Sequence, residues 1–168
     1  YFLGGNLIDL NIIFSGIESK KNITFKNRVF ERIDKRGLTG CLTFVDVFFK
    51  NVSVKASNAN CEDSVNIINS TGKIKELNIS ESAHDGIDLD FSELNIENIF
   101  VNKSGNDCVD VSYGNYIFKE VNVSSCGDKG ISVGERSSLS SDVTKVEMSN
   151  IGLASKDSST TKLNELEI

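Results

Sequence analysis

The chain has 168 residues, which suits a single domain with its own core, and its net charge is −6. Residues 1–60 hold nine Lys and Arg against five Asp and Glu, whereas residues 61–168 hold nine against nineteen. This acidic balance excludes nucleic acid as a partner, because phosphate binding needs clustered basic residues. No run of about 18 apolar residues occurs, so we expect no membrane span. Proline is absent and Asn, Ser and Gly are abundant, which favours strands and tight turns.

The chain divides into a less regular start and a regular remainder. Apolar and polar residues alternate over residues 7–30, as in half-buried strands, and residues 31–39 have the composition of a polar loop. After this loop, two short apolar runs alternate with turns in each segment. We therefore expect one domain over 1–168, with less regular coils over 1–39 and regular coils over 40–168. The final letters, LNELEI, resemble an unfinished strand, which indicates a fragment of a longer chain.

A fixed step relates the regular segments. The first apolar runs are anchored at a constant interval, at Val65, Ile87, Val109, Ile131 and Leu153. The second runs repeat less evenly, with a longer step before the fourth anchor and a shorter one after it, at Ile79, Val101, Val123, Met148 and Ile168. We assign the added residues of the longer step to the polar turn before Met148.

A repeat of this length predicts a solenoid. We expect an all-β fold, a single-stranded right-handed parallel β-helix with coils of about 22 residues. Leucine-rich repeats share the period, but they need a helical segment opposite the strand, and these segments alternate like strands instead.

Carboxylates stand on the outward side of these strands. Alternation turns Ile87 and Leu89 inward, so Asp88 and Asp90 point outward, with Asp110 one coil further on. Like charges stacked across neighbouring strands destabilise a sheet, so a raised pKa, a bound cation or nearby basic side chains must offset them. Ca²⁺ prefers such oxygen ligands, and we expect any calcium to be held by Asp85, Asp88, Asp107 and Asp110. No other cofactor is required, and a solvated acidic face without a ligand is the alternative.

A second set of carboxylates lies in the turns before these strands. Asp85, Asp107 and Asp128 recur at this place, and we expect them to cap backbone N–H groups.

Four cysteines are spread over successive segments, with no CxxC pair and a single histidine, which excludes a zinc site. Their spacing makes two bridges between adjacent coils conceivable, with free thiols as the alternative. The pairs are Cys41 with Cys61 and Cys108 with Cys126.

Short phrases over residues 83–157 resemble the polygalacturonase family, within the pectate-lyase-like superfamily of right-handed β-helix proteins. That family carries the motifs N-T-D, D-D, G-H-G and R-x-K on successive coils. The matching places in this chain hold Ala83-His84-Asp85, Asn106-Asp107, Asp128-Lys129-Gly130 and Ala154-Ser155-Lys156.

The resemblance implies that Asp85 and Asp107 would position the attacking water and that Lys156 keeps one of the two basic positions. The chain departs from the family at three places, because Asn106 stands for the acid, Lys129 for the histidine and Ala154 for the arginine. An asparagine cannot donate a proton as an acid does. We therefore do not expect polygalacturonase chemistry, although one of the outward aspartates could replace the acid.

Residues 127–135 and 152–159 also resemble bacterial β-helix repeat proteins that accompany exported or surface-anchored domains. This resemblance implies a secreted or cell-surface location. Tyr113 and Tyr116 flank the acidic coil and could stack on a sugar ring, or they are ordinary exposed turn residues.

We therefore expect a non-catalytic module that binds a polysaccharide or cell-surface glycan, with Ca²⁺ as an optional aid. The expected ligand-binding residues are Asp88, Asp90, Asp110, Tyr113, Tyr116 and Lys129. One alternative is a polysaccharide hydrolase or lyase with rearranged acids. The other is a structural adhesin or spacer rod without a ligand.

Overall fold

The computed structural model describes residues 1–17 and 32–168. Within these ranges the chain is built from strands joined by turns. The strands are β1 (Phe2–Ile8), β2 (Asn11–Ser15), β3 (Gly40–Ala59), β4 (Asp63–Ile68), β5 (Thr71–Ser82), β6 (Asp85–Asp90), β7 (Glu93–Ser104), β8 (Val109–Ser112), β9 (Asn115–Gly134), β10 (Ser138–Ser155) and β11 (Thr160–Glu167).

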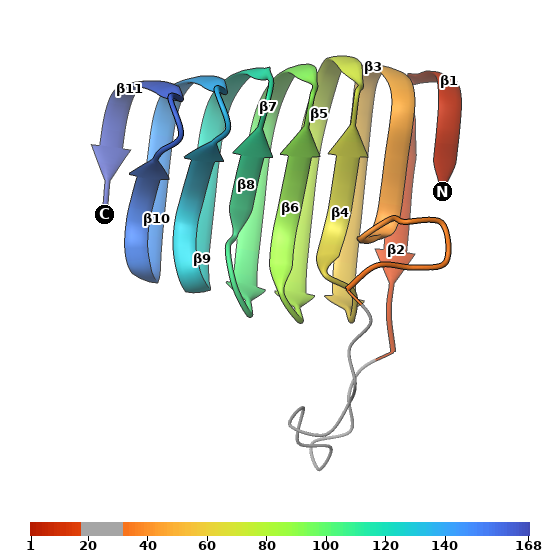
Figure 1. Cartoon of the computed structure of the whole chain (residues 1–168), viewed down its shortest axis with the longest axis horizontal. Coiled ribbons are helices and arrows are strands. Elements are labelled where there is room, and N and C mark those ends of the chain that lie inside the picture. The colour runs from red at the N-terminus through yellow and green to blue at the C-terminus, as the bar shows by residue number, and fades with distance from the viewer. Residues whose placement is uncertain (18–31) are drawn as a thin grey trace.

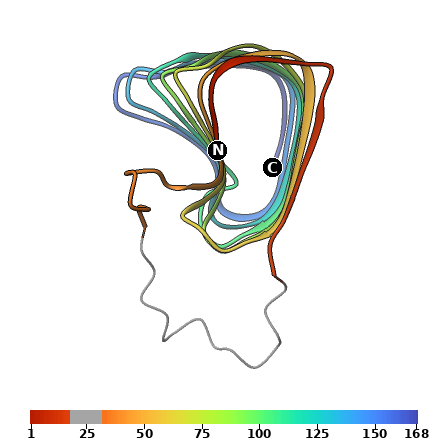
Figure 2. The same cartoon turned by 90° about the vertical axis from the view of Figure 1, so that its right-hand side faces the viewer.

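These strands wind into a parallel solenoid of about six turns (Figure 1). Every strand pairs in parallel with its equivalent in a neighbouring coil, in the order β11-β10-β9-β7-β5-β3-β4-β6-β8. Two layers face each other across the core: β4, β6 and β8 lie in front in Figure 1, and β5 and β7 lie behind them. Seen down the long axis, the coils superimpose, and the turns of the later coils project farther than those of the earlier ones (Figure 2). The predicted all-β parallel solenoid is confirmed.

The constant step of the first apolar runs is the register of the front layer. Val65 pairs with Ile87, Ile87 with Val109, and Val109 with Ile131. All four side chains are fully buried and stack into one apolar ladder inside the solenoid. Complete burial of an aliphatic side chain stabilises the fold by about 1.5–3 kcal/mol, so these ladders hold the coils together.

The second apolar runs differ from the prediction at one anchor. Val123 pairs with Val146, not with Met148, and Met148 is 71% exposed at a corner with a positive φ of 52°. The step between these two rear strands is therefore one residue longer than the steps before it. The added residue lies in the β9–β10 turn, where Glu135 and Arg136 both adopt left-handed φ angles. An added residue in the polar turn before Met148 was predicted correctly, but Met148 is the wrong anchor, and the predicted sizes of the steps on either side of it are wrong.

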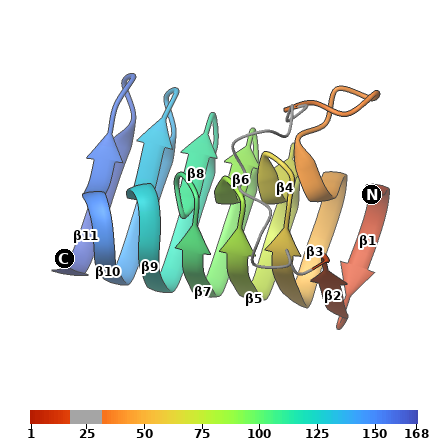
Figure 3. The same cartoon turned by 90° about the horizontal axis from the view of Figure 1, so that it is seen from below.

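The start of the chain joins the same sheet. β1 and β2 both pair in parallel with β3 (Figure 3). In the loop before β3, the Asp34 carboxylate accepts hydrogen bonds from the N–H groups of Arg36 and Leu38. The other part of the predicted irregular region, residues 18–31, lies outside the described residues.

Two disulfides connect neighbouring corners of the solenoid. They join Cys41 to Cys61 and Cys108 to Cys126, the two pairings that the spacing made conceivable. The described ranges contain no helix long and apolar enough to cross a bilayer.

The repeated phrase that opens β6 depends on a small residue. A Cβ atom at Gly86 would lie 2.5 Å from the carbonyl oxygen of Cys108 in the next coil. Glycine therefore lets the two backbones approach closely enough for Gly86 N–H to donate to the carbonyl oxygen of Asp107 at 2.9 Å.

Candidate functional site

The outward side chains of the front layer form a continuous polar strip, which we call the acidic face. Its five members are the outward residues of four successive coils, on β4, β6, β8 and β9: Asn66, Asp88, Asp90, Asp110 and Ser132. Register places them along the solenoid axis, since Asn66 pairs with Asp88, Asp88 with Asp110, and Asp110 with Ser132. Neighbouring members are therefore one strand spacing apart, about 4.8 Å.

The acidic face is not the solvated surface that one sequence interpretation describes. Asn66 and Ser132 are fully buried, and the three aspartates are only half-exposed. The Asn66 side-chain amide donates to Asp88 Oδ2 at 3.1 Å and to Asp90 Oδ2 at 3.3 Å. One amide thus bridges two carboxyl groups of the next coil, which fixes their orientation.

Burial changes the ionisation of these carboxyl groups. Desolvation raises the pKa of Asp88 well above its ordinary value, and the neighbouring charges of Asp63 and Asp90 raise it further. Desolvation also raises the pKa of Asp90, against the hydrogen bond from Asn66, and the pKa of Asp110. Because a protonated carboxyl group is neutral and can donate a hydrogen bond, the stacked acids avoid full mutual repulsion.

The Asn66 amide is only partly satisfied. Its Oδ1 atom is buried and has no hydrogen-bond partner, which costs about 1–3 kcal/mol. The half-exposed carboxyl groups of Asp88, Asp90 and Asp110 can bind hydroxyl groups of a ligand, because each hydroxyl both donates and accepts.

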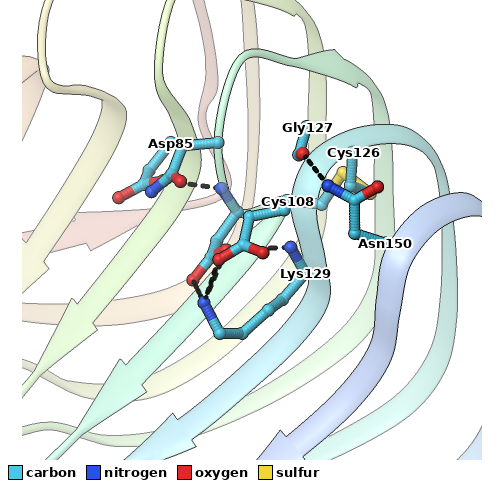
Figure 4. A network of polar contacts seen from close by, with 9 residues as sticks. Asp85, Cys108, Cys126, Gly127, Lys129 and Asn150 are labelled. Atoms are coloured by element: carbon cyan, nitrogen blue, oxygen red, sulfur yellow. Dashed lines mark hydrogen bonds and ion pairs between the residues drawn. A yellow bond between two sulfur atoms is a disulfide. The ribbon is translucent and has the colours of Figure 1, made fainter.

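The turn carboxylates before the strands form hydrogen bonds from coil to coil (Figure 4). Asp85 Oδ1 accepts the backbone N–H of Asp107 at 2.8 Å and the side-chain amide of Asn106 at 2.7 Å. Asp107 Oδ1 accepts the backbone N–H of Lys129 at 2.9 Å. These two aspartates cap N–H groups, as expected, but each caps the following coil. Burial still raises the pKa of Asp85 to about 6.

The third turn carboxylate occupies a different position from the one predicted. Asp128 N–H bonds to the carbonyl oxygen of Asn106, so Asp128 is equivalent to Asn106, and Lys129 continues the capping column. The coil keeps its 22-residue step here, and its aspartate stands one position earlier than Asp85 and Asp107 do in theirs.

The Lys129 ammonium group contacts both neighbouring carboxylates. It bonds to Asp128, the contact that contributes most to the raised pKa of Lys129, and it lies 3.4 Å from both carboxylate oxygens of Asp107. Lys129 therefore covers Asp107, which is 4% exposed.

Two charged side chains complete the strip at its C-terminal end. Lys156 is exposed on the β10–β11 turn, and its charge lowers the pKa of Asp110 against the dominant effect of burial. Glu135 accepts a hydrogen bond from the Ser112 hydroxyl at 2.5 Å, and its charge raises the pKa of Asp90. The acidic face thus meets the basic residue that the family resemblance singled out.

The two tyrosines expected to bind a ligand differ in burial. Tyr116 is 1% exposed, and its hydroxyl donates to the carbonyl oxygens of Leu89 and Ser112 at 2.8 and 2.9 Å. Tyr116 is therefore a core residue that joins β9 to the front layer, and the prediction that it contacts a ligand is wrong. Alternation explains the error, because Tyr116 lies on the inward side of β9 together with Phe118.

Tyr113 is 48% exposed and stacks on Phe91 of the previous coil, with ring centroids 4.9 Å apart and planes 4° from parallel. We call these two residues the aromatic pair. Both adopt left-handed φ angles, 51° at Phe91 and 46° at Tyr113. The equivalent corners of the coils before and after, at Asn69 and Glu135, are left-handed too, so this conformation belongs to the repeat. The aromatic pair directly follows Asp90 and Ser112, at one edge of the acidic face.

In the described part of the chain, no three His, Cys, Asp or Glu side chains are arranged to hold a metal ion. The four aspartates proposed for calcium are divided between the strip and the turn column, where Asp85 and Asp107 already accept backbone hydrogen bonds. Calcium stays a prediction, and protonation is the compensation that the geometry favours.

Sequence reasoning missed three members of the site, although the period contained the signal. Asn66, Phe91 and Ser132 each lie exactly one coil from a residue that was singled out, namely Asp88, Tyr113 and Asp110. The fixed step could have identified each of them.

The comparisons with known proteins add no relatives. No protein family model, no curated protein and no solved structure matches the chain. The resemblance to polygalacturonases therefore stays a prediction from short motifs.

Proposed function

We propose that the chain is a non-catalytic β-helix module that binds an uncharged polysaccharide through the acidic face and the aromatic pair. The observation that carries the proposal is the exposed Phe91–Tyr113 stack beside the half-exposed carboxyl groups of the acidic face. Sugar rings combine apolar faces, which pack on aromatic side chains, with hydroxyl groups, which bind carboxyl and amide groups. The two kinds of partner lie side by side here.

The charge of the face favours a neutral ligand over an acidic one. Three aspartates and Glu135 line the strip, and Arg136 and Lys156 are exposed in the turns at its C-terminal end. A polyuronide would add like charges at close range, which only a bridging cation could offset. Calcium would supply that bridge, so a calcium requirement is expected for acidic polymers and not for neutral ones.

A secreted or cell-surface location belongs to this proposal. The two disulfides support it, because such bonds persist in oxidising compartments and are rare in the cytosol.

The test is affinity electrophoresis against a panel of neutral and acidic polysaccharides. We expect retardation by at least one neutral polymer, and a loss of tenfold or more in affinity in the Phe91→Ala, Tyr113→Ala double variant. Phe48→Ala is the matched control, since Phe48 is a 44% exposed phenylalanine on β3 outside the site. Absence of retardation by every polymer, or equal retardation of the double variant, refutes the proposal.

A polysaccharide hydrolase is the second candidate, and one observation favours it. Burial raises the pKa of Asp88 well above its ordinary value, and a carboxyl group that keeps its proton can act as a general acid. In this case a reducing-sugar assay detects product, and Asp88→Asn abolishes it. Activity that survives Asp88→Asn rules out this role.

A further inference from the structure

A groove of about 410 Å³ lies on the rear layer, on the other side of the solenoid from the acidic face (Figure 1). We call it the polar groove, and its lining residues come from β5, β7, β9 and β10: Asn78, Ile79, Ser80, Phe100, Val101, Asn102, Asn122, Val123, Ser124, Lys145 and Glu147. Its size falls in the range of small-molecule sites, roughly 300–1,000 Å³.

Short side chains between sharp corners produce the groove. Asn78, Phe100 and Asn122 occupy one row, since each pairs with the next coil's equivalent. Ser80 and Ser124 belong to the neighbouring row. Beyond this second row each strand turns through a left-handed residue, and those corner residues mostly carry longer side chains: Glu81, Lys103, Ser125 and Met148. The two rows of short side chains therefore form the floor of the groove, and the corner residues form its raised border.

The groove has little free charge. Lys103 pairs with Glu81 at 3.1 Å, and Lys145 pairs with Glu167 at 3.1 Å. Glu147 is exposed at the end formed by β10. The floor side chains are uncharged, and the Asn122 amide donates to the exposed Glu120 carboxylate at 2.8 Å, so the negative charge beside the floor disfavours an anionic ligand.

The floor offers one aromatic ring between two carboxamides. Phe100 is half-buried, with Asn78 one coil before it and Asn122 one coil after it. Asn102 Oδ1 accepts the Ser124 hydroxyl at 3.1 Å, which holds the Asn102 amide in place with its two N–H donors available. Carboxamides and hydroxyls both donate and accept, as sugar hydroxyl groups require, and the ring provides an apolar face.

We infer that the polar groove is a second ligand site, which takes an uncharged glycan chain lying along the solenoid axis. The coils repeat at about 4.8 Å, close to the length of one pyranose residue, so successive sugars lie over successive coils. This site shares no residue with the acidic face, and it does not depend on the function proposed above.

The test is an amide NMR titration of the whole chain with four neutral hexasaccharides: cellohexaose, xylohexaose, mannohexaose and laminarihexaose. At least one sugar is expected to shift amides over residues 78–80, 100–102 and 122–124. Phe100→Ala should then weaken this binding at least tenfold, with Phe48→Ala as the matched control. Phe100→Leu keeps apolar packing but lacks the ring, so the same loss in this variant shows that unfolding is not the cause.

The outcomes separate the two sites. Shifts over the groove that persist in the Phe91→Ala, Tyr113→Ala double variant support a second site. Shifts confined to the acidic face overturn the inference and leave the proposed function intact. Absence of groove shifts for all four sugars, or equal binding by Phe100→Ala, also overturns it.

Discussion

The acidic face over β4, β6 and β8 and the polar groove over β5, β7 and β9 are built by the same coils but differ in charge and in hydrogen bonding. On the acidic face, half-buried carboxyl groups stack in register, and desolvation raises the pKa of Asp88 and of Asp110. Over the groove, the corresponding rows carry amides and hydroxyls, and the lysines at its border are paired with glutamates. The charges on the acidic face therefore destabilise the fold, whereas those around the polar groove do not.

This difference indicates where selection for function acts. A parallel solenoid needs only its inward ladders to fold, so outward residues can be neutral and solvated. Stacked acids beside an exposed aromatic pair reduce stability without serving the core. Structures usually keep such features where a ligand makes use of them.

The largest expected effect that distinguishes the two faces is a pH dependence of stability. Burial raises the pKa of Asp63 to about 7 and that of Asp85 to about 6, above the unfolded-state value near 3.8. The folded state therefore holds these protons more tightly, and its stability falls as the pH rises from about 4 through these values. For Asp85 alone the loss is on the order of 3 kcal/mol.

Thermal unfolding between pH 4 and pH 8 measures this effect. We expect the melting temperature to fall over this range, and Asp88→Asn to reduce the difference. Glu93→Gln removes an exposed carboxylate at the start of β7 and should leave the difference unchanged. A melting temperature that rises towards pH 8 contradicts the proposed protonation of the acidic face.

The next effect concerns the covalent link between the two layers. The Cys108–Cys126 disulfide joins the start of the β8 segment to the corner of β9 beyond the groove, with a sequence separation of 18 residues. The loop-entropy relation gives about 3 kcal/mol for a loop of this size. Guanidinium unfolding of the Cys108→Ala, Cys126→Ala variant should show this loss, and a loss below about 1 kcal/mol would argue against a stabilising link.

A smaller effect separates the two tyrosines. Tyr116→Phe leaves the carbonyl oxygens of Leu89 and Ser112 without this donor inside the core, which costs about 1–3 kcal/mol. Tyr113→Phe should change the free energy of unfolding by less than about 0.5 kcal/mol, because Tyr113 is half-exposed. Urea unfolding compares them, and equal losses would contradict the assignment of Tyr116 to the core.

The smallest effect compares one amide from each face. Asn66→Ala removes the amide that bridges Asp88 and Asp90 and should cost about 1–3 kcal/mol. Asn122 lines the groove, and Asn122→Ala should change the free energy of unfolding by less than about 0.5 kcal/mol, as is usual for surface substitutions. If both variants unfold at the same urea concentration, the two faces do not differ in energetic role.

The fold could be predicted from the sequence because its core is periodic. Val65, Ile87, Val109 and Ile131 follow one step, and that step is the strand register. The prediction of the core residues is wrong where one coil is a residue longer than the others. Met148 and Val146 are both apolar and both lie near the position that the period assigns to the core. Only the strand pairing shows that Val146 is the residue that enters the core.

The site was less predictable because residue type does not determine which way a side chain points or how deeply it is buried. Tyr113 and Tyr116 lie close together in the chain and are chemically identical, but a left-handed turn exposes the first and alternation buries the second. Asp128 resembles its counterparts in the motif, but it stands one position earlier in its coil, and Lys129 occupies the place equivalent to Asp107. The raised pKa values depend on desolvation by the whole fold, which no local motif encodes.

The most direct test of the acidic face is side-chain carboxyl NMR from pH 3 to pH 8, with and without the neutral hexasaccharides. We expect Asp88 to stay protonated well above pH 4 and a bound sugar to shift the carboxyl signals of Asp88, Asp90 and Asp110. Ordinary titration of all three groups, with signals that no sugar displaces, would contradict this expectation.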